Sequence, residues 1–276
     1  MKKTKISTYR FHDYKKYIKE WMQVNQVSLR QLANMLKISP SYLSLILNNK
    51  KDLSLDTEIL SKIKKVFKLD KNELKHFKDL ILLTRSDSHP KKIEIYNKIL
   101  KDSKYSSINT NEAETYSYLN HWFFVALKEY FSIENKPLDL KKIKNDFIFN
   151  LKFSEIKKAF SFLQKSGFIE LDKETNLIKS KSTHTQCYSD IYRLSLGAFH
   201  SQMFKLAIES IENVERNDRL ILGNTVSLSD EAYEKVKKLI LNLQSEIQKI
   251  EESDTNKSKV YHIGQAAFPL TKRILK

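Results

Sequence analysis

The sequence predicts a mainly α-helical chain with a small amount of β-structure in its second half. Glycine and proline, which interrupt helices, occur only four times each among 276 residues. Apolar residues recur at spacings of three and four over long stretches, as in helices with one buried face. Hydrophobic residues make up 41% of the chain, enough to form a core, so the chain is not disordered throughout.

The first domain, residues 1–85, is expected to consist of five short helices. In the last but one, Leu60, Ile63 and Phe67 fall on a single face at helical spacing. The other four helices show the same kind of apolar stripe. The predicted helices span residues 9–24, 28–36, 40–47, 55–67 and 71–83.

The charge of the chain is concentrated near its N-terminus. The net charge is +16. Residues 1–110 hold 24 lysines and arginines against 11 acidic residues, whereas residues 111–276 hold 25 against 22. A basic domain of this kind favours a polyanionic partner, most often nucleic acid.

Residues 28–50, with the sequence SLRQLANMLKISPSYLSLILNNK, have the pattern of a helix-turn-helix. Leu32 would be buried beneath the second helix, and the small Ala33 would let the two helices touch. Ser39 is expected to cap the second helix. Pro40 would take its first position, where the missing N–H of proline costs nothing.

The second helix of this motif would present its N-terminal end to the major groove, where side chains reach base edges. The amides near the start of the first helix can approach a phosphate, and the lysines after the second helix can attract one. An asparagine in the following turn tolerates a left-handed conformation. The predicted DNA-binding residues are Ser28, Ser39, Pro40, Ser41, Tyr42, Ser44, Asn48, Asn49, Lys50 and Lys51.

The motif resembles the lambda-repressor-like (Xre/Cro) helix-turn-helix family. The shared features are Leu-Ala in the first helix, Ser-Pro-Ser-Tyr-Leu-Ser opening the second, and Leu-Asn-Asn-Lys closing it. The family usually has glycine where Asn49 stands. The resemblance implies a five-helix domain that binds double-stranded DNA.

Residues 86–111 are expected to be a linker with one short helix, because the stretch RSDSHPKK is polar and contains a proline. Residues 112–182 are expected to form a winged-helix-like segment. Its nearly balanced charge favours a structural role, with DNA contact as the alternative. The predicted elements are helices at 116–131, 138–147 and 154–165, then a hairpin of residues 168–171 and 177–180.

Residues 183–276 are expected to form a small α+β unit for regulation or dimerisation, with a helix at 189–214. A β-α-β arrangement would follow, made of a strand at 219–228, a helix at 229–252 and a strand at 260–268. The second helix carries an apolar stripe that is either a dimer seam or the face that covers the sheet. The stripe comprises Ala232, Val236, Leu239, Leu243, Glu246 and Ile250, with Ile240 and Ile247 alongside.

This second half is also similar to a bacterial family that joins an Xre-like helix-turn-helix to a conserved domain of unknown function. Strings such as YLNHWFFVALKEY and LGAFHSQMFKLAIESI carry the similarity. The resemblance implies a transcriptional regulator, and it implies no particular ligand or chemistry.

Nothing in the sequence indicates a catalytic centre. His184, Cys187 and His200 lack the closely spaced pair that a zinc site uses, so no metal is expected. Gly-rich phosphate loops and nucleophile elbows are absent, so neither a cofactor nor an enzymatic activity is expected. The lone cysteine and the absence of a long apolar run suggest a cytoplasmic protein that does not enter a membrane.

These observations predict a sequence-specific DNA-binding transcriptional regulator that acts as a homodimer on double-stranded DNA. The C-terminal region would sense a signal or dimerise, and an effector or protein partner is left open. The alternative is a protein-interaction adaptor that reuses the helix-turn-helix fold without binding DNA.

Overall fold

The structure is a computed structural model that describes residues 3–133, 136–172, 174–175, 177–180 and 190–274. It is mainly helical, which confirms the predicted fold class. The chain forms two structural units. The N-terminal unit runs to Asn120 and also includes the start of a long helix, up to Ala198, and the C-terminal unit contains the remaining residues.

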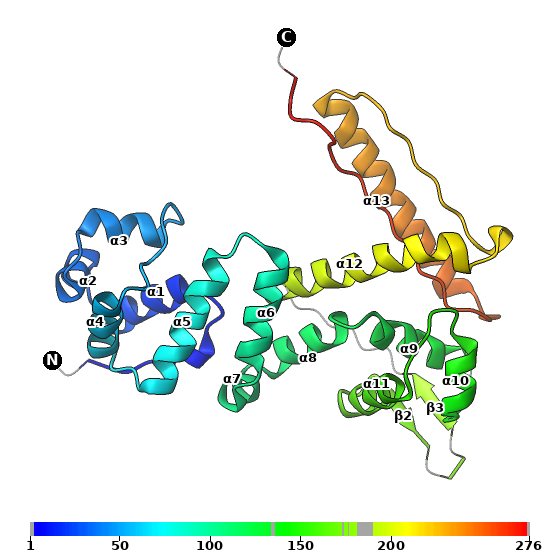
Figure 1. Ribbon diagram of the computed structural model, residues 1–276, viewed down its shortest axis with the longest axis horizontal. Helices are drawn as coiled ribbons and strands as arrows, with labels where there is room; N and C mark the ends of the chain where they lie inside the picture. The colour runs from blue at the N-terminus through cyan, green and yellow to red at the C-terminus, as the bar shows by residue number, and fades with distance from the viewer. Residues whose placement is uncertain (1–2, 134–135, 173, 176, 181–189, 275–276) are drawn as a thin grey trace. The chain divides into compact units, whose positions relative to one another are not determined.

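The five predicted N-terminal helices are all present (Figure 1). Each begins at a polar residue whose side chain accepts a hydrogen bond from a first-turn amide, which satisfies a donor that the helix leaves unpaired. These caps are Asp13, Ser28, Ser39, Asp56 and Asp70. The helices are α1 (Tyr14–Val24), α2 (Leu29–Leu36), α3 (Pro40–Leu47), α4 (Thr57–Phe67) and α5 (Lys71–Arg85).

An aromatic cluster forms the centre of the N-terminal unit. The ring of Phe67 lies 4.9 Å from that of Trp21 and 5.4 Å from that of Tyr17, in edge-to-face contacts. Phe77 packs against Tyr17 with centroids 5.5 Å apart. These side chains come from α1, α4 and α5 and are fully buried, so the three helices share one core.

The stretch expected to be a linker belongs to the same core. It contains α6 (His89–Leu100) and α7 (Ser103–Ile108), and Tyr96, Ile99 and Tyr105 are buried. The Tyr105 hydroxyl donates to that of Tyr96 at 3.1 Å. The linker prediction is therefore corrected. The polar stretch contains only a short break between α5 and α6, and the apolar faces of the helices that follow pack against the first five.

The predicted helix at 116–131 is two helices, α8 (Thr110–Leu119) and α9 (Trp122–Ser132), separated at Asn120 and His121. The N-terminal unit ends between these two residues. The periodicity continues across the break, which is why the sequence pattern did not reveal it.

The segment from α9 onward has the element order of a winged helix. A three-stranded antiparallel sheet has the order β1-β3-β2, with Ile169 opposite Ser180. Gly167, just past the end of the helix at Phe153–Lys165, has φ 74°, the left-handed conformation that glycine adopts most easily. The elements after α9 are β1 (Lys136–Pro137), α10 (Leu140–Asp146), α11 (Phe153–Lys165), β2 (Ile169–Leu171) and β3 (Leu177–Ser180).

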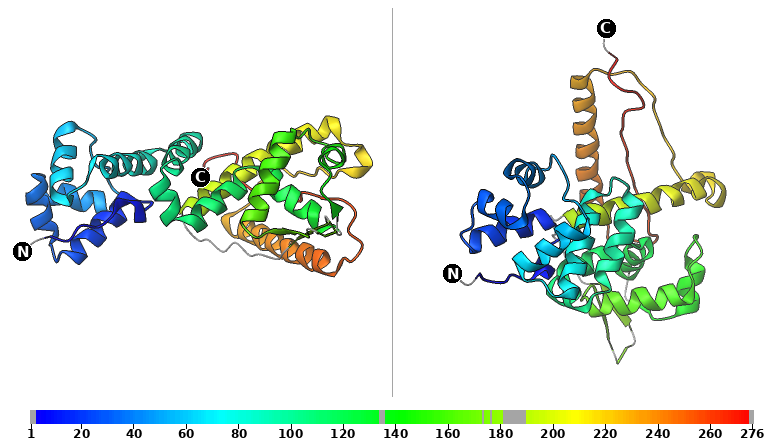
Figure 2. Two further views of the ribbon diagram at one scale, coloured as in Figure 1. Left: turned by 90° about the horizontal axis from the view of Figure 1, so that it is seen from below. Right: turned by 60° about the vertical axis from the view of Figure 1, so that its left-hand side comes forward.

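The C-terminal β-α-β prediction is wrong for its strands. After α12 (Asp190–Asn213) and the 3-10 turn η2 (Arg216–Asp218), residues 219–228 are extended but form no ladder, and the same holds for residues 260–268 after α13 (Asp230–Ser253). Figures 1 and 2 show both extended segments running beside α13. An alternating apolar pattern makes a strand only where a second strand supplies backbone partners, and among the described residues neither segment pairs with one.

Candidate nucleic-acid interface

The helix-turn-helix is held together by a small apolar contact between α2 and α3. Leu32 and Ala33 are fully buried on α2, and Leu43 and Ile46 are fully buried on α3. The side chain of Ile38, in the turn, packs against the same cluster. The inward faces of both helices are therefore used, which leaves the opposite face of α3 to solvent.

The start of α2 is closed by a capping box. The Ser28 hydroxyl accepts a hydrogen bond from the Gln31 amide at 3.3 Å, and the Gln31 side chain accepts one from the Ser28 amide at 2.8 Å. The side chain of the predicted site residue Ser28 therefore caps α2. An anion could bind at this end to the N-terminus of α2 and to the exposed side chain of Arg30. Arg30 was not among the residues predicted from the sequence.

The turn between the helices is set by two backbone features. Lys37 is left-handed, with φ 55°, and the amide of Ile38 donates back to the Ala33 carbonyl at 3.0 Å. The Ser39 hydroxyl then accepts from the Tyr42 amide at 3.1 Å, so Ser39 is the cap of α3 as predicted. Pro40 occupies the first turn. The direction of α3 thus follows from local interactions within five residues.

The outward end of α3 presents small polar residues. Ser39, Pro40 and Ser41 are exposed, and Ser44 is half-buried one turn further along. Tyr42 is different, because its ring is half-buried and its hydroxyl donates to the Asp52 carbonyl at 3.1 Å. Tyr42 therefore holds the following loop against α3, while the three serines and the proline form the accessible face.

The loop after α3 is fixed by a buried lysine. The Lys15 ammonium, 7% exposed, donates to the Asn49 side-chain oxygen at 3.0 Å and lies 3.5 Å from an Asp52 carboxylate oxygen. Asn49 has φ 60°, which confirms the predicted left-handed turn. Asn48 donates to the Ser44 hydroxyl at 3.3 Å. The amide groups of both asparagines are thus committed within the chain.

Tyr14 completes this anchor from α1. Its hydroxyl accepts from the Leu53 amide at 3.2 Å and donates to an Asp52 carboxylate oxygen at 3.4 Å. Burial raises the pKa of Tyr14, so the hydroxyl stays protonated and keeps both bonds. Neither Tyr14 nor Lys15 could be assigned to this loop from the sequence, because only the fold brings residues that far apart into contact.

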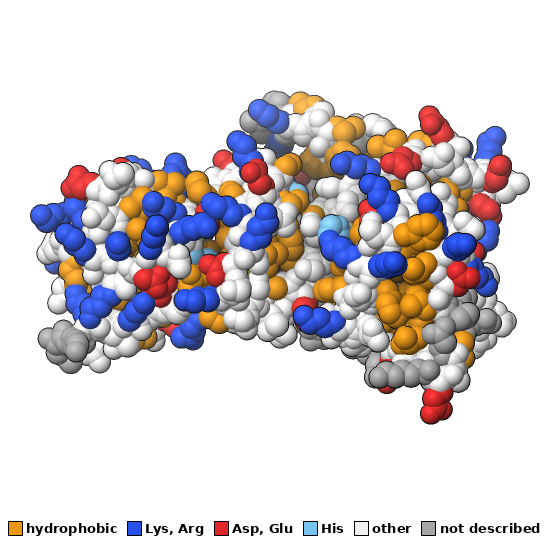
Figure 3. All heavy atoms as spheres, turned by 60° about the horizontal axis from the view of Figure 1, so that its bottom comes forward, with side chains coloured by type: hydrophobic (Ala, Val, Ile, Leu, Met, Phe, Trp, Pro, Cys, Tyr) orange, Lys and Arg blue, Asp and Glu red, His pale blue; other side chains and the backbone are white. Residues whose placement is uncertain are grey.

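Cations surround the accessible face of α3. Lys50 and Lys51 are exposed directly after the helix, and Arg30 and Lys37 are exposed on α2 and in the turn. Figure 3 shows that lysine and arginine side chains outnumber acidic ones over the N-terminal unit on the face drawn. The lysines predicted after α3 are therefore accessible, and so are two cations that were not predicted, Arg30 and Lys37.

The winged-helix-like segment has a weaker basic surface. Lys157, Lys158 and Lys165 are exposed on α11. The Lys158 ammonium lies 3.1 Å from the His121 Nε2 atom and 5.8 Å from the centre of the Phe124 ring. Burial and this neighbouring ammonium lower the pKa of His121. Lys158 is thus packed against its own segment, in keeping with the structural role favoured for this part.

His200 contacts the rings of Phe199 and Phe204, while His184 and Cys187 lie outside the described residues. Within the described ranges, no cluster of three or more His, Cys, Asp or Glu side chains could hold a metal ion. None of the helices described is both long and apolar enough to cross a bilayer.

Comparison with known proteins finds a family match for the second half of the chain. A family model for a domain of unknown function (DUF4423) matches residues 101–270, which begin after the helix-turn-helix and extend through the winged-helix-like segment, α12 and α13. No curated protein and no solved structure matches the chain. Because the matched region covers more than half of the sequence, the chain belongs to the DUF4423 family.

Proposed function

We propose that this protein is a DNA-binding transcriptional regulator whose N-terminal unit binds double-stranded DNA through the exposed end of α3. The observation that carries the proposal is the division of α3 into two faces. Leu43 and Ile46 are fully buried, whereas Ser39, Pro40 and Ser41 are exposed at the N-terminal end of the helix. A recognition helix needs this division, because one face must pack and the other must enter the groove.

The charges around α3 fit the two kinds of contact that such a complex needs. Arg30, Lys50 and Lys51 can meet phosphates on either side of the groove, and the N-terminus of α2 adds backbone amides. These contacts set the position of the protein and dominate its affinity. Ser41 and Ser44 would contact base edges.

The serines limit how much sequence one copy can read. A bidentate contact from arginine or glutamine is worth about 1–3 kcal/mol of discrimination, and a single serine hydroxyl cannot make one. We therefore propose that the regulator reads two half-sites, with the DUF4423 region supplying assembly or regulation. Arg30 and the lysines would contribute affinity at both half-sites.

Substitution of serines on the outward side of α3 tests the site. We expect Ser41→Glu and Ser44→Glu to abolish specific DNA binding with little change in the melting temperature, because each adds a carboxylate to a face that must approach phosphates. Ser107→Glu is the matched control, since Ser107 is exposed on α7, away from α3 in Figure 1. Fluorescence anisotropy with a duplex selected from a random pool measures the effect. Unchanged affinity in both variants would contradict the assignment.

Salt dependence separates DNA binding from the adaptor alternative. The logarithm of the binding constant of a DNA-binding protein should fall linearly with the logarithm of salt concentration, with a slope of about −0.9 per phosphate neutralised. Lys50→Ala and Lys51→Ala should each make the slope less steep by roughly one. An adaptor that reuses the fold would bind the selected duplex no more tightly than a random one, because its net charge gives only salt-sensitive, non-specific attraction.

A further inference from the structure

The C-terminal arm, residues 204–274, contains no buried residue. All of these residues are described, and many are large and apolar. Isolated apolar side chains on a surface need no explanation, but a continuous arm without a core does, because ordering a chain costs entropy that only burial offsets. The exposed large apolar residues include Phe204, Ile208, Leu220, Leu222, Leu239, Leu241, Ile250, Phe268 and Leu270. Among the residues that the structure describes, nothing therefore buries the apolar side chains of the arm.

Helix α13 concentrates this surface into one seam. Ala232, Val236, Leu239, Leu243, Glu246 and Ile250 alternate at spacings of four and three, the a and d positions of a heptad. Leu239 is 67% exposed, Leu243 50% and Ile250 67%, and no residue of α13 is buried. The sheet that was the alternative cover for this stripe does not form. The seam is therefore open to a partner.

The chain's own tail does not cover the seam. The Tyr233 hydroxyl donates to the Ala267 carbonyl at 2.8 Å, and Arg273 lies 3.5 Å from Asp230. The tail thus runs back along the helix on the side of Tyr233. Ile240 and Ile247, on that side, are half-buried. Of the a and d positions, Ala232 and Val236 are half-buried, whereas Leu239, Leu243, Glu246 and Ile250 stay exposed.

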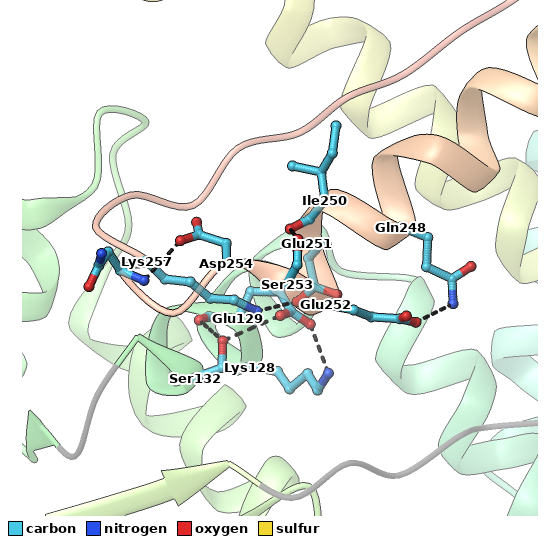
Figure 4. A network of polar contacts seen from close by, with 11 residues as sticks. Lys128, Glu129, Ser132, Gln248, Ile250, Glu251, Glu252, Ser253, Asp254 and Lys257 are labelled. Atoms are coloured by element: carbon cyan, nitrogen blue, oxygen red, sulfur yellow. Dashed lines mark hydrogen bonds and ion pairs between the residues drawn. The ribbon is translucent and has the colours of Figure 1, made fainter.

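The C-terminal end of α13 lies near charged residues of α9. Figure 4 shows Glu251 beside Lys257, with Glu129 and Lys128 of α9 close by. Glu251 pairs with Lys257, and this ion pair, helped by Glu129, raises the pKa of Lys257. Lys128 pairs with Glu129 at 2.8 Å. The Glu251 carboxylate is thus paired within the chain, at the end of α13 that lies near α9.

We propose that a second copy of the chain covers this seam, with the two α13 helices antiparallel. The stripe is complementary to itself in that direction. With the two-fold axis near Leu241, the small Ala232 meets Ile250 of the partner subunit, and Leu239 meets Leu243 of the partner subunit. A surface that matches its own copy in this way gives a closed dimer.

Glu246 decides the direction of the pairing. In a parallel pair, Glu246 would face Glu246 of the partner subunit in an apolar layer, which places two like charges together. In the antiparallel pair, Glu246 lies opposite Val236 of the partner subunit and next to that subunit's Lys235. The carboxylate then lies beside a cation, so charge favours the antiparallel arrangement.

Light scattering and sedimentation of the full chain test the seam. We expect a dimer that Leu239→Glu combined with Leu243→Glu weakens at least about 100-fold, because four carboxylates enter the apolar layers. Leu241→Glu combined with Gln248→Glu is the matched control, with both residues on the opposite side of α13, and should leave the dimer intact. Circular dichroism should show folded protein in each case. A monomeric wild type, or equal weakening by both pairs, would overturn the proposal.

Distances between spin labels test the direction. In a chain in which Cys187→Ser removes the only native cysteine, a label at Ser253→Cys should lie about 35 Å from its partner along the helix axis, given 1.5 Å per residue. A label at Asn242→Cys should lie close to its partner. Short distances at both positions would show a parallel pair and overturn the antiparallel arrangement. Both measurements use protein without DNA, so their failure is distinct from failure of the proposed function.

Discussion

The N-terminal unit and the C-terminal arm are built from helices of similar amphipathic sequence, yet only the first has a core. Leu43 on α3 is fully buried, whereas Leu239 on α13 is 67% exposed. In the N-terminal unit, seven helices from α1 to α7 surround aromatic side chains from several elements. The arm has one long helix between two extended segments. An apolar stripe therefore shows that a helix needs a partner, and only the fold shows whether the chain supplies it.

The largest difference in stability between the two regions should appear when a leucine in each is replaced by alanine. We expect Leu43→Ala to lower the free energy of unfolding of the N-terminal unit by about 2–5 kcal/mol, through lost burial and the cavity that remains. Leu241 on α13 is 69% exposed and lies off the seam. Leu241→Ala should therefore change the free energy of unfolding of its own unit by less than about 0.5 kcal/mol. Urea denaturation followed by tryptophan fluorescence in a Trp122→Phe background reports on the N-terminal unit, because the remaining Trp21 lies in its core. Equal losses of stability from both substitutions would contradict the difference between a packed N-terminal unit and an unpacked arm.

Acid should destabilise the N-terminal unit through His76. Burial among Tyr9 and Tyr105 lowers the pKa of His76 to about 4, despite the opposing influence of Asp102 and Asp79. Because the unfolded histidine titrates near 6.5, the unfolded state binds more protons between these two values. Stability should therefore decrease as the pH falls from about 6.5 to about 4, by roughly 3 kcal/mol in total.

The control for this pH dependence is His76→Phe, which keeps an aromatic ring in the core. Its unfolding free energy should vary less between pH 6.5 and pH 4 than that of the wild type. The measurement is urea denaturation at a series of pH values. An equally steep dependence in the variant would assign the effect to other groups.

The smallest effects concern two matched helix caps. The Ser39 hydroxyl accepts from the Tyr42 amide at 3.1 Å, and the Ser229 hydroxyl accepts from the Ala232 amide at 3.2 Å. Ser39→Ala should cost about 1 kcal/mol in the unfolding of the N-terminal unit, because α3 is part of its core. Ser229→Ala should only fray the start of α13, as a small loss of ellipticity. A drop in the denaturation midpoint of the N-terminal unit with Ser229→Ala would show that the arm and this unit unfold together.

Local sequence determined most of the helices and the architecture of the candidate site. The cap at Ser39, the proline after it and the left-handed turn at Asn49 depend on neighbouring residues, so they could be predicted from short motifs. The hairpin of the winged-helix-like segment was predictable for the same reason, since its two strands are close in sequence. The DNA-binding role of these residues stays a prediction.

Tertiary structure decided the features that depend on residues far apart in the chain. Lys15 reaches Asn49 and Asp52 only because α1 packs beside the loop after α3. Residues 86–111 join the core because Tyr96 and Tyr105 meet side chains from the first helices. Residues 219–228 and 260–268 have a strand-like pattern but no ladder, since a strand requires a neighbour that periodicity cannot supply. Local periodicity thus specifies what a segment can become, and the contacts available in the folded chain decide what it does become.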